Sequence, residues 1–224
     1  MDNRKCRFCG HELTTTFVDL GLAPLSNEYI QEKGRQKGQQ FYPLVVKVCD
    51  DCKLVQALEY EKPENIFTDY KYFSSFSKSW LVHCKEYVDM IVEKLNLSAS
   101  SDVVEIACND GYLLQFFKSY GIPTYGIEPA ENVAKEAQKK GIDVLVEFFS
   151  DKIVPELLNK KGKADLIIGN NVLAHVPDIN GFVEGMHLLL KKSGTITMEF
   201  PHLLKLIQLN QFDTIYHEHF SYLF

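Results

Sequence analysis

Residues 102–111 read Asp-Val-Val-Glu-Ile-Ala-Cys-Asn-Asp-Gly, and this stretch decides how the second half of the chain is interpreted. Residues 103–107 form a short and mostly apolar stretch, which is typical of a buried strand. The loop after it departs from the G-x-G-x-x-G pattern whose glycines admit a pyrophosphate. The stretch therefore predicts a buried strand that leads into a ligand-binding loop in which a dinucleotide is disfavoured.

The residues that follow continue the pattern as an alternation of strands and helices. Such an alternation predicts an α/β fold, in which helices cover both faces of a parallel sheet. Ligands of these folds bind in a crevice at the carboxyl ends of the strands. The expected strands are 103–107, 124–127, 143–146, 164–168 and 194–200, and the expected helices are 112–120, 130–140, 151–159 and 179–190.

Acidic and small residues at the ends of the first two predicted strands suit a particular ligand. Glu105 and Asp110 would face a cationic group, and Ala107 and Gly111 are small enough for close approach of the backbone. Glu128 follows the next strand, about 20 positions downstream, where an acid is placed to hold ribose hydroxyls. An adenosine with a positive centre and no pyrophosphate fits S-adenosylmethionine, which we expect as the cofactor.

Two Cys-x-x-Cys pairs lie near the start of the chain. Cys6 and Cys9 form the first pair, and Cys49 and Cys52 form the second. Two such pairs can aim four thiolates at one ion and complete a tetrahedral structural zinc site. We therefore predict structural zinc, although the 39-residue gap between the pairs exceeds the usual zinc-ribbon spacing. Unconnected reduced thiols, or a single redox pair, are the alternatives.

The bulk composition limits the partners. The chain has 224 residues, of which 46% are hydrophobic, and a formal net charge of −6 at pH 7. It has no basic block of the kind that binds a polyanion, so nucleic acid is not an expected partner. It also has no signal-peptide pattern and no run of about 18 apolar residues, so we expect a cytoplasmic protein that binds no membrane.

The motifs divide the chain into three regions. We expect a zinc-binding module at 1–65, an aromatic segment and connecting helix at 66–98, and a methyl-donor-binding domain at 99–224. The chain ends on the aromatic and apolar residues 220–224, whereas a natural C-terminus is usually polar and solvated. We therefore expect that the sequence stops before a further C-terminal domain.

Three blocks of sequence together resemble a known family. Glu-x-Ala-x-Asn-Asp-Gly at 105–111, followed by Gly-Ile-Glu-Pro-Ala at 126–130, resembles the first two motifs of class I methyltransferases in a glycine-poor variant. With the twin Cys-x-x-Cys module ahead and Tyr-His-Glu-His at 216–219, the chain resembles the nucleotide-sugar C-methyltransferases of deoxysugar pathways. The type examples of that family methylate C3 of a TDP-linked 4-keto deoxysugar. The resemblance implies a Rossmann-like domain that binds S-adenosylmethionine, preceded by a small zinc-binding domain.

The resemblance also assigns residues to the donor and the substrate. The methionine end of the donor would lie near Ala107, Asn109 and Gly111, with the ribose at Glu128 and the adenine near 147–150. The expected donor residues are Glu105, Ala107, Asn109, Asp110, Gly111, Glu128, Pro129, Phe149, Asn170 and Asn171, and the expected sugar-binding residues are Tyr70 and Tyr72.

The same resemblance implies a catalytic set. A ketone at C4 acidifies the proton at C3, and His219 is the expected base because imidazole titrates near neutral pH. Tyr216 would donate a hydrogen bond to the enolate oxygen. Glu218 would orient an imidazole or bind the sugar, and His175 would share in proton transfer.

Two other functions remain open from the sequence. One is a zinc-containing methyltransferase that acts on nucleic acid or protein, and the other is a module that binds the donor without catalysis. The sequence leaves the nucleotide, the sugar and the oligomeric state undetermined.

Overall fold

The computed structural model describes residues 3–27, 38–67 and 70–224, which form two compact units. Unit 1 comprises Met1–Ile66, Asn171–Asn180 and Phe200–Phe224. Unit 2 comprises Phe67–Asn170 and Gly181–Glu199. Unit 1 is therefore assembled from three separate stretches of sequence.

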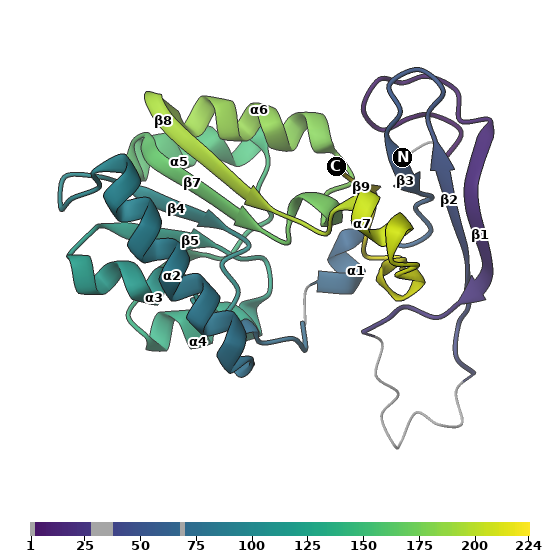
Figure 1. The fold of residues 1–224 in the computed structure, drawn as a ribbon. Coiled ribbons are helices and arrows are strands. Elements are labelled where there is room, and N and C mark those ends of the chain that lie inside the picture. Colours follow the sequence, from purple (N-terminus) through teal and green to yellow (C-terminus); the bar gives the residue numbers. More distant parts are fainter. Residues whose placement is uncertain (1–2, 28–37, 68–69) are drawn as a thin grey trace. The chain divides into compact units, whose positions relative to one another are not determined.

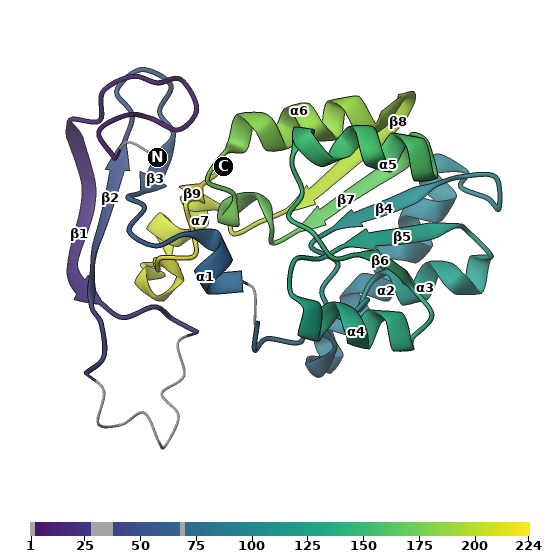
Figure 2. The same cartoon turned by 180° about the vertical axis from the view of Figure 1, so that it is seen from behind.

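Unit 2 is built on a five-stranded parallel sheet with the order β6-β5-β4-β7-β8. Figures 1 and 2 show α2, α3 and α4 on one face of this sheet and α5 and α6 on the other. The predicted α/β fold is confirmed. The strands are β4 (Val103–Ile106), β5 (Thr124–Ile127), β6 (Asp143–Leu145), β7 (Ala164–Asn170) and β8 (Leu190–Glu199). The helices are α2 (Lys78–Leu95), α3 (Leu114–Phe117), α4 (Glu131–Lys139), α5 (Val154–Lys161) and α6 (Ile179–Leu189).

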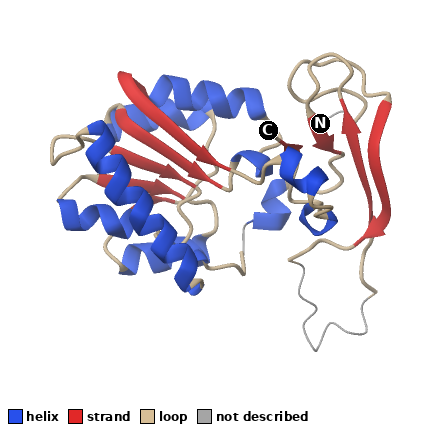
Figure 3. Cartoon of the chain, in the orientation of Figure 1, coloured by secondary structure: helices blue, strands red, loops and turns tan. Residues whose placement is uncertain are grey.

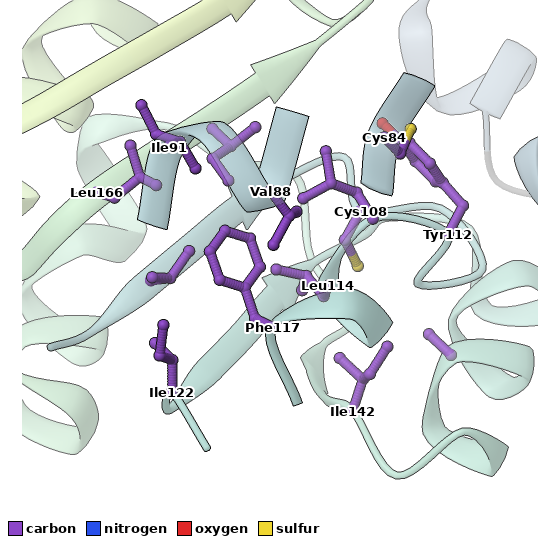
Figure 4. Packing of buried hydrophobic residues seen from close by; sticks show 14 of the residues in the cluster. Cys84, Val88, Ile91, Cys108, Tyr112, Leu114, Phe117, Ile122, Ile142 and Leu166 are labelled. Carbon is purple, nitrogen blue, oxygen red and sulfur yellow. The ribbon is translucent and has the colours of Figure 1, made fainter. Parts of the chain in front are cut away.

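The core of unit 2 lies between the sheet and helices α2 and α3. Figure 4 shows Val88 and Ile91 of α2 beside Leu114 and Phe117 of α3. Gly126 in β5 leaves room for Cys108 of this core, because a Cβ atom at position 126 would lie 2.2 Å from the Cys108 sulfur. The loop after β4 is therefore pressed directly against the backbone of β5.

Two predicted helices of unit 2 differ from the observed ones at their ends. The helix expected at 112–120 has an α-helical part only over Leu114–Phe117 and continues as a 3₁₀ turn over Lys118–Tyr120. The helix expected at 151–159 begins with a 3₁₀ turn, and α5 starts at Val154. Pro155 lies in the first turn of α5. The N–H groups of a first helical turn have no partner within the helix, so proline, which lacks an N–H group, is tolerated there.

Unit 1 contains a four-stranded antiparallel sheet with the order β1-β2-β3-β9 (Figures 1 and 3). Its strands are β1 (Thr15–Ala23), β2 (Tyr42–Val48), β3 (Val55–Ala57) and β9 (Ser221–Tyr222), and short helices α1 (Pro63–Phe67) and α7 (Leu203–Gln208) accompany them. Leu203 and Leu206 of α7 pack with Val46, Val55 and Tyr222 from three of the strands. The end of the chain thus completes a sheet that begins near its start.

Among the helices of the described residues, none combines the length and the apolar character that crossing a bilayer requires.

Candidate active site and metal centre

Four thiols meet in unit 1. The sulfur atoms of Cys6, Cys9, Cys49 and Cys52 all lie within 4.8 Å of one another. The distance from Cys6 to Cys52 is 3.6 Å, and from Cys9 to Cys49 it is 3.5 Å. In a tetrahedral site with Zn–S bonds of about 2.3 Å, the sulfur atoms are about 3.8 Å apart. The cysteine set therefore fits a four-thiolate zinc site.

The two Cys-x-x-Cys pairs adopt the same tight turn. The N–H group of Gly10 donates to the carbonyl of Cys6 at 2.9 Å, and that of Lys53 donates to Cys49 at 3.0 Å. Gly10 (φ 76°) and Lys53 (φ 66°) both occupy the left-handed region that closes such turns. The two turns thereby place the four sulfurs close to one another.

Gln56 supports the first turn, and its sequence position carries no pattern that would have revealed this role. It lies in β3 and is 1% exposed. Its Nε2 donates to the sulfur of Cys6 at 3.1 Å, and its Oε1 accepts from the backbone N–H of Arg7 at 3.0 Å. Hydrogen bonds of this kind stabilise a thiolate and orient it toward a metal.

In unit 2, the Glu128 carboxylate joins the loops that follow β4 and β5. Its Oε2 accepts from the N–H of Asn109 and its Oε1 from the N–H of Ala130, both at 2.9 Å. The side chain is 5% exposed. Burial raises the pKa of Glu128 to about 7, against the lowering effect of these two hydrogen bonds. Each oxygen retains a lone pair, as the expected contact with ribose hydroxyls requires.

The loop after β4 has three residues in left-handed conformation: Ala107 (φ 57°), Asn109 (φ 49°) and Gly111 (φ 73°). At Gly111, a Cβ atom would lie 2.2 Å from Cδ1 of Ile142 and 3.2 Å from Ala137. Gly111 is therefore needed for packing against α4. Ala107 is partly exposed and keeps the small surface expected beside the donor.

Asn109 also ties the aromatic segment, residues 70–76, to this loop. Its Oδ1 accepts from the N–H of Ser74 at 2.8 Å, and its Nδ2 donates to the carbonyl of Tyr72 at 3.1 Å. Asn132 of α4 makes a similar pair of hydrogen bonds with the backbone of Tyr70, at 3.3 and 2.7 Å. The structure thus holds the backbone of Tyr72 against the expected donor residue Asn109 and the backbone of Tyr70 against α4, and Tyr72 is 53% exposed.

The two acidic residues expected near the cationic end of the donor are enclosed by protein groups. Asp110 accepts from the ammonium of Lys140 at 3.3 Å and from the N–H of Ser75 at 3.3 Å. Glu105 lies fully buried in β4. Burial raises the pKa of Glu105 well above its usual value, although the hydroxyl of Tyr112 opposes the shift.

The remaining expected donor residues lie at the carboxyl ends of the strands and beyond β6. Pro129 directly follows Glu128 after β5. The ring of Phe149 packs edge-on against Phe182 of α6, with the ring centroids 5.3 Å apart. Asn170 is the last residue of β7, and Asn171 after it has a positive φ of 52°.

In unit 1, Tyr216 and His219 are directly hydrogen-bonded. The Tyr216 hydroxyl lies 2.9 Å from His219 Nε2, and His219 Nδ1 lies 2.8 Å from the carbonyl oxygen of Thr214. A carbonyl can only accept, so Nδ1 carries the proton and Nε2 of the neutral ring has the lone pair. Burial lowers the pKa of His219 and favours this neutral form.

His175 lies beside this pair. The centroids of the His175 and His219 rings are 4.7 Å apart, and the two rings meet edge to face. Burial, reinforced by the neighbouring His219, lowers the pKa of His175 to about 3. Two neutral imidazoles therefore lie in contact at neutral pH.

The other two residues of the Tyr-His-Glu-His segment have different surroundings. Glu218 is 1% exposed, and its Oε1 accepts from the hydroxyl of Ser26 and from Nδ2 of Asn27, both at 2.7 Å. Ser26 and Asn27 carry no sequence signal that would have marked them as its partners. His217 contacts the carbonyl of Pro43 through Nε2 at 3.2 Å, which is a structural role.

Comparisons with known proteins identify two families in the chain. Residues 78–223 match a family described as a methyltransferase domain. The chain belongs to this methyltransferase family. Residues 6–67 match a family of proposed zinc-binding domains. The methyltransferase domain has the class I fold and takes S-adenosylmethionine as its cofactor, and the four cysteines of the zinc-binding region lie close enough together to hold a metal ion.

Two curated proteins are similar to this chain. The C-methyltransferase NovU of Streptomyces niveus is 34% identical over 218 residues, which cover 97% of this chain and 52% of NovU. A ubiquinone biosynthesis O-methyltransferase of Bordetella avium is 28% identical over 96 residues, which cover 42% of this chain and 40% of that enzyme. The chain thus spans about half the length of the curated relatives it matches.

A solved structure shares the fold. A protein of Pyrococcus horikoshii matches with a TM-score of 0.50 and 16% identity, over 67% of this chain and 66% of that one. This likeness concerns the fold alone.

Proposed function

We propose that this chain is the donor-binding and acid–base part of an enzyme that methylates carbon. The acceptor would be a nucleotide-linked 4-keto deoxysugar, methylated at C3. The observation that carries the proposal is the hydrogen bonding of His219: its Nδ1 faces the Thr214 carbonyl, which can only accept, and its Nε2 faces the Tyr216 hydroxyl. The named C-methyltransferase relative supports the same reaction class.

The first step would be removal of the C3 proton. His219 Nε2 takes the proton, and the electron pair of the C–H bond moves toward the C4 ketone to give an enolate. Because burial lowers the pKa of His219, the ring is unprotonated and competent as a base at neutral pH.

Tyr216 would stabilise the enolate oxygen. Its hydroxyl has a single proton, which the free protein directs at His219 Nε2. The same proton cannot serve the ketone oxygen at the same time. Binding of the ketone would therefore turn the hydroxyl toward the substrate and release the Nε2 lone pair for proton abstraction.

Bound S-adenosylmethionine would supply the electrophilic methyl group that the enolate carbon attacks. Among the residues of this chain, Glu128 would hold the ribose and Ala107 would leave room beside the loop after β4. The four cysteines would fill a tetrahedral zinc shell and leave no open position for catalysis. A small-molecule acceptor also agrees with the net charge of −6, which does not favour nucleic acid.

Solvent deuterium exchange tests this proposal. The enzyme is incubated with a TDP-4-keto-6-deoxy sugar in D₂O, with and without S-adenosylmethionine, and followed by NMR. We expect exchange at the carbon beside the ketone that requires His219, and methylation when the donor is added. Donor binding without exchange would call for other nucleotide sugars, and failure of every keto sugar would refute the acid–base assignment.

A further inference from the structure

Arg7 lies within the first cysteine pair, between Cys6 and Cys9, yet its side chain leaves the turn. Its backbone N–H is held by Gln56 Oε1 at 3.0 Å, which fixes the start of the side chain. Its Nη2 donates to the carbonyl of Ala57 in β3 at 2.6 Å. The residue therefore connects the cysteine turn to the strand beside it.

The same guanidinium reaches the two segments that carry the proposed catalytic histidines. Its Nη1 donates to the carbonyl of Pro177 at 3.4 Å, two residues after His175. Its central carbon lies 5.3 Å from the ring centroid of Phe220, the residue that follows His219. Phe220 is fully buried, so this cation–π contact is shielded from solvent.

The two histidine segments are also joined to each other and to β3. The N–H of Phe220 donates to the carbonyl of Ala174 at 2.7 Å, and the N–H of Ala57 donates to the carbonyl of Phe220 at 3.1 Å. Arg7 thus contacts all three members of one hydrogen-bonded assembly. The 4.7 Å contact between the His175 and His219 rings lies within it.

The shape of the Arg7 side chain suits it to this role. A planar guanidinium can hold two carbonyls and cover an aromatic ring at once, whereas a lysine ammonium cannot reproduce that fork.

We propose that Arg7 is a positioning residue that holds the His175–His219 pair in the geometry needed for proton transfer. This inference rests on the proposed function and adds a residue to it. The cysteine turn would then have a second role besides binding metal, because it anchors the side chain that fixes the two histidine segments.

The test uses the variants Arg7→Gln and Arg7→Lys, with Lys5→Gln as the matched control. Lys5 precedes Cys6 and is exposed, so the control removes one positive charge at the same turn. The chain has 7 histidines, so the ring resonances of His175 and His219 can be assigned with His→Asn variants. Zinc content, the dissociation constant for S-adenosylmethionine and the deuterium exchange rate are measured on the same samples.

We expect Arg7→Gln to shift or broaden both histidine ring signals and to slow exchange about tenfold to a hundredfold. Zinc content and donor affinity should match wild type, Arg7→Lys should recover part of the rate, and Lys5→Gln should change nothing. Unchanged ring signals, or ring changes that appear only together with loss of zinc, would overturn the proposal. Absence of exchange in the wild-type enzyme with every keto sugar would refute the proposed function, whereas the ring spectra would still decide whether Arg7 positions the histidines.

Discussion

Glu128, the proposed ribose ligand, also holds two loops together in the ligand-free fold. Both carboxylate oxygens accept backbone N–H groups, one from Asn109 and one from Ala130. An amide at this position offers only one acceptor and presents an NH₂ group to the other N–H. The carboxylate is therefore required even before any donor binds.

The variant Glu128→Gln tests this double role. We expect donor affinity to fall at least about tenfold and the free energy of unfolding to fall by about 1–3 kcal/mol, the cost of an unpaired buried N–H group. Calorimetric titration with S-adenosylmethionine and thermal unfolding measure the two effects. A variant that keeps wild-type stability would show that these backbone hydrogen bonds contribute little.

The proposed acid–base roles of His219 and Tyr216 lead to a second prediction. His219→Asn and Tyr216→Phe should each reduce methyl transfer by about 10²–10⁴-fold, the usual contribution of a general acid or base. The dissociation constant for S-adenosylmethionine, measured by calorimetry, should stay unchanged. His217→Gln serves as the control, since His217 contacts the Pro43 carbonyl through Nε2 and the ring of Tyr42 edge-on. Loss of donor binding in step with activity would contradict these roles.

His175 should make stability depend on pH. In the folded chain its pKa is lowered to about 3, whereas an unfolded histidine titrates near 6.5. Below pH 6.5 the unfolded chain therefore binds a proton that the folded chain does not. The contribution of His175 to the free energy of unfolding is therefore complete above pH 6.5. It falls by about 1.4 kcal/mol per pH unit as the pH decreases toward 3.

The comparison with His175→Asn isolates this contribution. Between pH 7 and pH 5, wild type should lose about 2 kcal/mol more stability than the variant, measured by urea unfolding at each pH. Parallel curves for the two proteins would show that His175 is protonated as readily in the folded state as in the unfolded one.

At the scale of elements, the inner strands β4 and β7 of unit 2 were predictable because parallel strands inside a sheet are buried on both faces. Both appear in the sequence as short runs in which most residues are apolar, at Val103–Ile106 and Ala164–Asn170. The strands of unit 1 carry a weaker signal. β1 is mostly exposed and so lacks a buried apolar pattern. β3 has 3 residues and β9 has 2, so these two strands are recognised only from the strands with which they pair.

The residues of the proposed sites also differ in how clearly the sequence marked them. The cysteine pairs and Glu128 were visible because spacing or strand position marked them. Gln56, Arg7, Ser26 and Asn27 are single polar residues whose partners lie far away in sequence. Their roles depend on tertiary contacts that no local pattern encodes.

The contact between β5 and the loop after β4 gives an element-scale prediction. Gly126→Ala would place its Cβ 2.2 Å from the Cys108 sulfur and should cost about 1–3 kcal/mol through overpacking. Chemical denaturation measures the change. Adding Cys108→Ala removes that sulfur and should restore part of the loss, whereas Gly38→Ala, which meets no atom within 4 Å, is the neutral control. Additive effects of Gly126→Ala and Cys108→Ala would contradict a direct clash.

At the scale of the whole molecule, the four cysteines and the proposed acid–base segment, residues 216–219, belong to one unit. They nevertheless lie at opposite ends of the sequence. β9 pairs with β3, and Gln56 of β3 contacts the Cys6 sulfur. Loss of the metal should therefore disturb the residues around His219 as well as the cysteine turns.

Cys6→Ser tests this coupling. We expect loss of bound zinc, a lower melting temperature and altered NMR signals of the His219 ring, because a structural zinc site contributes directly to folding free energy. Cys84→Ser, at a buried cysteine of unit 2, should leave the zinc content unchanged. A wild-type protein that contains no metal, with a melting curve that Cys6→Ser does not alter, would refute the zinc site.

The pairing of Gln56 with Ser221 also determines when unit 1 can form during synthesis. As the chain leaves the ribosome, its cysteine turns emerge early, but the strand that completes their sheet is made after all of unit 2. Unit 2 is thus free to fold first as an insertion between the parts of unit 1, since domains generally fold as units during translation. Until residue 222 emerges, the nascent chain carries β3 with an unpaired edge and can hold metal without an assembled acid–base segment.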